Sequence, residues 1–152
     1  MKKIASFTVN HDTLEKGMYI SRIDGDVVTY DIRMKLPNGG DYLDMDAAHT
    51  LEHLFATYVR NTDCAEQVIY VGPMGCRTGF YFLVRDGISP AKAIELVKES
   101  MAFVRDYEGE IPGSKKEECG NYLAHDLGGA KTLGADMYEV LKAWSVADLQ
   151  YK

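Results

Sequence analysis

Hydrophobic and polar residues alternate along several short segments of this chain. The clearest alternation lies in residues 27–36, where every second side chain from Val28 onwards is apolar. This pattern is typical of a strand with one buried face. Shorter apolar runs at residues 18–23, 68–71 and 80–84 predict three further strands, bounded by turn-forming glycine, proline, asparagine and aspartate residues.

Two longer segments repeat hydrophobic residues every three or four positions, which indicates helices with one buried face. The first covers about residues 46–60 and can be capped by Asp44 or Asp46. Its apolar stripe consists of Leu51, Leu54, Phe55, Tyr58 and Val59. The second covers about residues 89–107 and begins with Ser89-Pro90, a cap followed by a proline in the first turn. Its inward positions are Ile94, Val97, Met101 and Val104.

A third, largely helical segment is expected from about residue 117 to residue 144, although its glycines weaken the pattern. Helices and antiparallel-looking strands are interleaved without a regular βαβ alternation, which favours an α+β fold. We therefore predict one compact domain over residues 1–152, with an antiparallel sheet packed against helices. A helical hairpin bundle with a minor sheet is the alternative.

Composition and charge narrow the class of protein. The chain is 46% hydrophobic, so it can bury a sizeable core, and its net charge of −6 argues against nucleic acid or an anionic membrane as the main partner. We see no apolar run of membrane-spanning length and no signal-peptide core, which suggests the cytoplasm. Three cysteines, an odd number, are read as reduced thiols.

The residues with the clearest chemical signal lie on the first predicted helix. His49 and His53 are four positions apart, so their imidazoles share one helix face and are close enough to share a metal ion. Glu52 projects from the same side. A helical H-x-x-E-H is the inverzincin pattern, in which both histidines bind zinc and the glutamate activates water. A metal site is therefore the first hypothesis, and the reaction stays open.

A catalytic metal site usually has a third protein ligand and one open position. Cys76 and Cys119 are the soft candidates, and Glu117 and Glu118 are the hard ones. Cys119 would complete a His2Cys set suited to Zn2+ or Fe2+. Cys76 lies on a constrained glycine-rich turn beside a cationic residue, which suits a reactive thiolate. Spacing alone does not choose between the thiols. Cys64 is interpreted as a small buried core residue.

Five groups of residues, taken together, closely resemble the S-ribosylhomocysteine lyase (LuxS) family in order and spacing. They cover nearly the whole chain. They are Ser6-Phe7 with His11, Asp31-Ile32-Arg33, His49-Thr50-Leu51-Glu52-His53, Pro73-Met74-Gly75-Cys76-Arg77-Thr78-Gly79-Phe80-Tyr81, and Cys119-Gly120-Asn121 with His125-Asp126-Leu127.

The resemblance implies a homodimer with its active site at the subunit interface. It implies one Fe2+ per subunit, replaceable by Zn2+ or Co2+, bound by His49, His53, Cys119 and a water. The implied substrate is S-ribosylhomocysteine, cleaved to homocysteine and 4,5-dihydroxy-2,3-pentanedione. That product is the autoinducer-2 precursor of quorum sensing, and the cleavage also serves the activated methyl cycle.

The implied chemistry suits these residues. A thioether leaves only when a carbonyl stands two carbons away, so the substrate carbonyl must migrate twice before β-elimination. Each migration removes one proton and returns another, which requires a Lewis acid and positioned acid/base groups. By resemblance these groups are Cys76, as a thiolate, and Glu52. Arg33 would keep Cys76 ionised, although by its strand position alone it would be a solvated residue.

The same resemblance assigns substrate contacts to Ser6 and His11, and Arg60 on the metal face of the helix is a weaker candidate. Taken alone, His11 would be a surface residue, and His125 is interpreted as structural. Two residues depart from the family pattern: Tyr70 and Asn10 stand where carboxylates are usual. Both departures bear on recognition of the amino-acid part of the substrate.

Two other functions compete with the lyase. An inverzincin-like metallopeptidase would need only the H-x-x-E-H helix and a downstream glutamate ligand, with no role for Cys76. A non-enzymatic metal-binding module would close the His2Cys set with a fourth protein ligand. Neither alternative uses the Cys76 turn.

Overall fold

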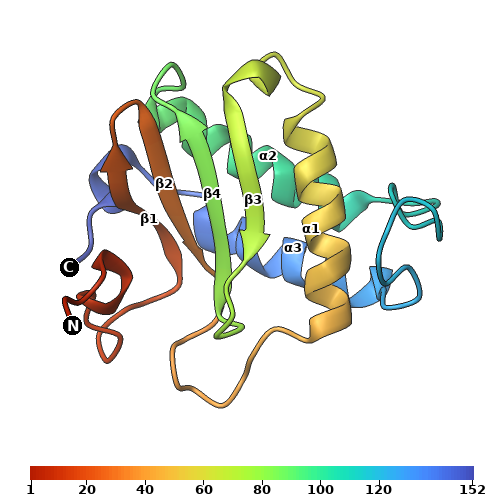
Figure 1. The fold of residues 1–152 in the computed structure, drawn as a ribbon, viewed down its shortest axis with the longest axis horizontal. Helices are drawn as coiled ribbons and strands as arrows, with labels where there is room; N and C mark the ends of the chain where they lie inside the picture. Colours follow the sequence, from red (N-terminus) through yellow and green to blue (C-terminus); the bar gives the residue numbers. More distant parts are fainter.

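A four-stranded antiparallel sheet with helices packed on one face makes up the fold (Figure 1). The computed structural model describes residues 1–152. The strands are Gly17–Asp24 (β1), Val27–Arg33 (β2), Val68–Pro73 (β3) and Gly79–Arg85 (β4), and the helices are Met45–Val59 (α1), Pro90–Asp106 (α2) and Leu127–Leu141 (α3). Three short 3-10 helices are Ala5–Phe7 (η1), Ala65–Gln67 (η2) and Val146–Leu149 (η3). The predicted α+β class and antiparallel sheet are confirmed.

Strands β2 and β4 form the middle of the sheet, which has the order β1-β2-β4-β3. Tyr30 pairs with Phe82 and Ile32 with Phe80, and all four side chains are buried. They pack in one core with the apolar stripe of α1 and the inward positions of α2. Each large buried side chain stabilises the fold by about 1.5–3 kcal/mol through removal from water. The core therefore holds α1, and with it the H-x-x-E-H motif, against the sheet.

Each helix begins at a side-chain cap. Asp44 accepts a hydrogen bond from the Ala47 N–H, and Ser89 accepts one from the Lys92 N–H. Such caps stabilise a helix by about 1 kcal/mol. They confirm the predicted starts of the first two helices. None of the helices is long and apolar enough to span a membrane.

The prediction for residues 117–144 is wrong in its first part. Residues 107–126 form turns and irregular chain, and α3 begins only at Leu127, where Asp126 accepts a hydrogen bond from the Gly129 N–H. The glycines that weakened the helical pattern belong to close packing instead: a Cβ on Gly129 would lie 2.8 Å from the Ala47 Cβ. They allow α3 to approach α1 and α2.

The strand predicted for residues 27–36 ends early, at Arg33. The N–H groups of Met34 and Lys35 both donate to the Thr78 carbonyl, so the chain leaves the ladder beside the turn between β3 and β4. This early exit places the end of β2 next to Cys76.

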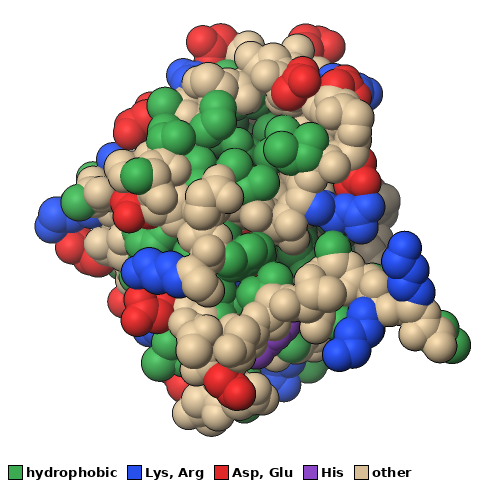
Figure 2. All heavy atoms as spheres, turned by 90° about the vertical axis from the view of Figure 1, so that its left-hand side faces the viewer, with side chains coloured by type: hydrophobic (Ala, Val, Ile, Leu, Met, Phe, Trp, Pro, Cys, Tyr) green, Lys and Arg blue, Asp and Glu red, His purple; other side chains and the backbone are tan.

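The sheet face opposite the helices carries no helix of its own. Side chains alternate across a strand. The residues of β2 that lie between the buried Val28, Tyr30 and Ile32 therefore point to this open face. Figure 2 views the molecule from the β1 edge of the sheet, where the two termini lie, and shows hydrophobic side chains gathered on that side. Large exposed hydrophobic residues include Ile4, Phe7, Ile23 and Tyr70.

Candidate active site

Helix α1 presents His49 and His53 one turn apart toward the irregular segment of residues 107–126. The His49 Nδ1 lies 2.7 Å from the Ala124 carbonyl oxygen, and the His53 Nδ1 lies 2.9 Å from that of Pro112. A carbonyl only accepts, so each Nδ1 carries the proton and each Nε2 keeps its lone pair. Both rings therefore leave Nε2 free to bind a metal.

The segment that supplies these carbonyls also approaches the rings closely. Gly113 follows Pro112 with a φ of +71°, and a Cβ there would lie 3.1 Å from the His53 Nδ1. Glycine adopts this left-handed conformation without steric cost. It lets the backbone turn directly under the His53 ring.

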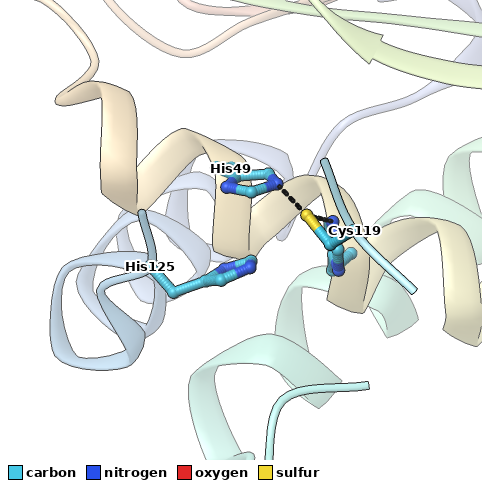
Figure 3. Close-up of side chains that lie close together, drawn as sticks. His49, Cys119 and His125 are labelled. Atoms are coloured by element: carbon cyan, nitrogen blue, oxygen red, sulfur yellow. Dashed lines mark hydrogen bonds between the residues drawn. The ribbon is translucent and has the colours of Figure 1, made fainter. Parts of the chain in front are cut away.

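Cys119 completes the set of donors (Figure 3). Its Sγ lies 3.4 Å from the His49 Nε2 and 4.0 Å from the His53 Nε2. Ligand atoms of a tetrahedral site with metal–nitrogen bonds of about 2.0 Å and metal–sulfur bonds of about 2.3 Å lie about 3.5 Å apart. The two imidazoles and the thiol therefore fit a divalent transition metal. Of the two candidate thiols, the structure brings Cys119 to the histidines.

His125 also lies at this centre, which the sequence interpretation did not include. One ligand atom each from His49, His53, Cys119 and His125 lie within 4.8 Å of one another. The His125 ring stacks on His49 with centroids 4.0 Å apart and planes 18° apart. Burial, and then the charges of His49 and His53, lower the pKa of His125. Its position six residues after Cys119 was the available signal.

Glu52 and the Cys76 turn face each other across a cleft beside the metal centre. The cleft has a volume of about 340 Å3, and its walls include His49, Glu52, Met74 and Gly75. It therefore joins one metal ligand and a carboxylate to the loop that carries the second candidate thiol.

The turn itself is pinned to the chain entering α1. The Arg77 Nε donates to the Leu43 carbonyl at 3.0 Å, and the Leu43 N–H donates to the Arg77 carbonyl at 2.8 Å. Arg77 has a φ of +61°, which is rare for a residue other than glycine. These two hydrogen bonds hold the Cys76 turn at a set distance from the start of α1.

The exposed Cys76 thiol meets a buried cation behind the turn. The Arg33 Nη1 donates to the Thr78 Oγ1 at 2.7 Å and lies 4.0 Å from the Cys76 Sγ. The Thr78 Oγ1 lies 3.1 Å from the same sulfur. Arg33 is only 3% exposed, so the expectation of a solvated strand residue is wrong.

A carboxylate compensates the buried charge of Arg33. Asp31 accepts from the Arg33 Nε at 3.1 Å and from Nη2 at 2.7 Å, a two-point ion pair. The Tyr151 hydroxyl donates to the Asp31 Oδ2 at 2.6 Å. Burial, and then the Asp31 charge, raise the pKa of Tyr151, so the phenol stays protonated. The second-last residue of the chain thus closes this network.

The predicted substrate contacts lie apart from the cleft in this single chain. Ser6 lines a separate hollow of about 290 Å3 on the open face, together with Tyr70 and Tyr81. The His11 Nδ1 lies 2.8 Å from the Val9 carbonyl oxygen. The Arg60 guanidinium donates to the Val68 and Ile69 carbonyls at 3.4 and 3.0 Å, which ties the end of α1 to β3. None of the three predicted contacts lines the cleft beside Glu52.

Comparison with known proteins gives a consistent result. The family described as S-Ribosylhomocysteinase (LuxS) matches residues 4–147. A protein named S-ribosylhomocysteine lyase from Phocaeicola vulgatus is 46% identical over 157 aligned positions, covering 99% of this chain and 98% of that protein. Proteins of the same name from Clostridium acetobutylicum and Porphyromonas gingivalis are 45% and 44% identical, each over 99% of both chains.

Proposed function

Because this chain belongs to the S-ribosylhomocysteine lyase (LuxS) family, we propose that His49, His53 and Cys119 hold its metal, and that Glu52 and Cys76 move the protons. The chain is a carbon–sulfur lyase that cleaves S-ribosylhomocysteine, with a metal site of the His2Cys type. The assignment of these residues rests on one observation: α1 and the Cys76 turn line the same cleft.

Carbonyl migration explains why two proton carriers are needed. The substrate carbonyl moves from C1 to C2 and then to C3, and each move transfers a proton between neighbouring carbons before β-elimination releases homocysteine. A bound divalent metal polarises a carbonyl oxygen and stabilises the negative charge that builds on it. Glu52 lines the cleft, as do the neighbours of Cys76 in its turn, and Glu52 and Cys76 would take and return the protons.

Arg33 supports the thiolate in this scheme. Its guanidinium lies 4.0 Å from the Cys76 Sγ and is held there by the Asp31 ion pair. A fixed buried cation favours the anionic form of a neighbouring acid. Cys76 would therefore act first as a base, and Arg33 as the residue that positions its charge.

We propose Fe2+ as the native metal, with Zn2+ or Co2+ as substitutes, one ion per subunit. Two imidazoles and one thiolate suit all three ions. His49, His53 and Cys119 would hold the ion, which would supply Lewis-acid chemistry to the substrate. Metal analysis of protein purified without oxygen distinguishes the three ions directly. The reactive thiolate chemistry suits the reducing cytoplasm, where we place the enzyme.

A second copy of the chain is the proposed partner of the open sheet face. Tyr70 is 54% exposed and Phe7 is 70% exposed, which makes this face costly to leave in water. In a homodimer, Ser6 and His11 of one subunit could complete the site of the other. Sedimentation equilibrium tests this: wild type should sediment as a dimer, and Phe7→Asp should shift it toward monomer. A monomeric wild type would contradict the proposal.

Thiol release from S-ribosylhomocysteine tests the assignment of the proton carriers. Cys76→Ala and Glu52→Ala should each abolish release while the bound metal stays at one per subunit. Cys64→Ala, a core thiol, and Glu66→Gln, an exposed carboxylate, are the matched controls and should retain release. A chelator should inactivate the wild type.

Unchanged thiol release in the Cys76 and Glu52 variants would contradict their roles. Cleavage of a peptide by the purified enzyme, independent of Cys76, would instead support the inverzincin-like alternative.

A further inference from the structure

One buried hydroxyl, that of Thr78, lies between the Arg33 guanidinium and the Cys76 thiol. Thr78 is only 3% exposed. Its Oγ1 lies 2.7 Å from the Arg33 Nη1 and 3.1 Å from the Cys76 Sγ, whereas the guanidinium itself lies 4.0 Å from that sulfur. The shortest hydrogen-bonded path from the buried cation to the thiol therefore runs through the Thr78 hydroxyl.

The chemistry of the three groups fixes the direction of these hydrogen bonds. A guanidinium only donates, so the Thr78 oxygen accepts from Arg33 through one of its lone pairs. The hydroxyl has one proton of its own, which stays available for a second partner. A thiolate has no proton and only accepts. When Cys76 is ionised, the Thr78 hydroxyl is therefore the donor in its contact with the sulfur.

The backbone around Thr78 holds this hydroxyl in place. The Thr78 carbonyl accepts from both N–H groups of residues 34–35, which follow β2. The next residue, Gly79, pairs with Arg33 across the sheet, and a Cβ on Gly79 would collide with the Ile32 carbonyl oxygen. Glycine allows the start of β4 to approach the end of β2 this closely. The Thr78 side chain is thereby fixed beside the Arg33 guanidinium.

Several charged or titratable side chains surround the Cys76 turn, but few of them contact the sulfur. They are Arg33 and Asp31 on β2, Tyr81 on β4, Arg77 in the turn, and His49 and Glu52 on α1. Burial raises the pKa of Tyr81, so its phenol stays neutral. The hydrogen-bond contacts of the Cys76 sulfur are with Thr78 and Arg33 alone.

We propose that Thr78 is a positioning residue, whose hydroxyl accepts from Arg33, donates to the Cys76 thiolate and so links the buried cation to the sulfur. The role of Cys76 as a proton carrier rests on the proposed function. A hydrogen bond to the charged form of an acid favours that form, and successive hydrogen bonds polarise one another. Thr78 therefore raises the amount of thiolate at a given pH from a buried position behind the turn.

The pH profile of Cys76 alkylation tests this role without any turnover. The zinc-loaded enzyme is treated with iodoacetamide over a range of pH, and mass spectrometry follows the peptide that carries Cys76. Thr78→Val keeps the shape of the side chain but removes the hydroxyl, so the midpoint of the profile should rise by about 1 to 2 pH units. Thr78→Ser keeps the hydroxyl and should stay close to wild type.

A matched control removes a buried hydroxyl elsewhere. The Ser100 Oγ donates to the Leu96 carbonyl within α2 and is fully buried, so Ser100→Ala should keep the wild-type midpoint. Thiol release gives a second readout: in Thr78→Val, kcat should fall about 10-fold or more at pH values below the new midpoint and recover above it, with KM little changed. If the wild type released no thiol, the proposed function would fail while the alkylation comparison would still stand.

A wild-type midpoint in Thr78→Val, or an equal rise in Thr78→Ser, would overturn the proposal. If Thr78→Val does not fold, proton NMR can observe the Thr78 hydroxyl directly in the zinc-loaded enzyme, because burial slows its exchange with water. Its resonance should move upfield in Cys76→Ala, where the sulfur acceptor is lost. An unchanged hydroxyl resonance would overturn the proposal as well.

Discussion

The two walls of the cleft hold their reactive groups by different physical means. On the metal wall, backbone carbonyls of the irregular segment 107–126 orient the imidazoles of α1. On the thiol wall, a buried ion pair at the end of β2 stands behind Cys76. A histidine that binds a metal needs its Nε2 lone pair held in a fixed direction. A neutral carbonyl that accepts a hydrogen bond from Nδ1 holds it so. A thiolate needs a nearby cation, and a cation in the protein interior needs a carboxylate.

This difference has an energetic consequence. The metal wall gains stability when the ion binds, since a bound metal crosslinks α1 to the segment that carries Cys119. The thiol wall is stable without a ligand, but it contains a charge pair that becomes costly when one member is removed. Substitutions on the two walls should therefore produce different signatures.

Removal of the two thiols should separate the walls most completely. Cys119→Ala should lose both bound metal and activity, because two imidazoles alone bind the ion weakly. Cys76→Ala should lose activity to the detection limit and keep its metal. Elemental analysis together with thiol release measures both properties. Equal metal loss in the two variants would contradict the division into a metal wall and a thiol wall.

Asp31→Asn should cause the largest loss of stability. It leaves the Arg33 guanidinium buried without a countercharge, which lowers the free energy of unfolding by about 3–5 kcal/mol. Urea denaturation measures this loss. The matched control, Asp24→Asn, breaks the solvent-exposed pair with Arg22 and should change stability too little to resolve. A similar loss in both variants would exclude the buried pair as its cause.

Tyr151→Phe should have a smaller effect on the same wall. It removes one hydrogen bond to a buried carboxylate, and the free energy of unfolding should fall by about 1.5–3 kcal/mol. The folded protein retains the Tyr151 proton above the ordinary pKa of 10.0, where an unfolded chain releases it. Wild-type stability should therefore be complete below about pH 10 and fall above it. Denaturation at pH 8 to 11 should show a shallower fall in Tyr151→Phe.

The smallest predicted effect concerns the helix cap beside the metal wall. Asp126→Ala should lower stability by about 1 kcal/mol, as should Ser89→Ala, because each removes one N-terminal cap. Only Asp126→Ala should also increase hydrogen exchange in residues 107–126, since this cap anchors the end of that segment. Equal exchange in both variants would show that the segment is held by other contacts.

Local patterns in the sequence were sufficient for much of this molecule. Caps and apolar stripes act over three or four residues, so the starts of α1 and α2 and the shared face of His49, Glu52 and His53 follow from the sequence alone. The order of short motifs also placed the chain in its family. Such signals need no knowledge of distant contacts.

Long-range contacts settled the rest. Spacing left Cys76 and Cys119 as equal candidates for the metal, and the folded chain brings Cys119 to histidines some 70 residues away. The segment before α3 is irregular and not helical, because its carbonyls accept hydrogen bonds from the His49 and His53 rings. Periodicity in the sequence does not reveal these contacts. The sequence does not show that Arg33 is buried, because its hydrogen-bond acceptor Thr78 lies 45 residues away along the chain. His125 joins the cluster of possible metal donors only because α1 and residues 107–126 meet in the folded chain.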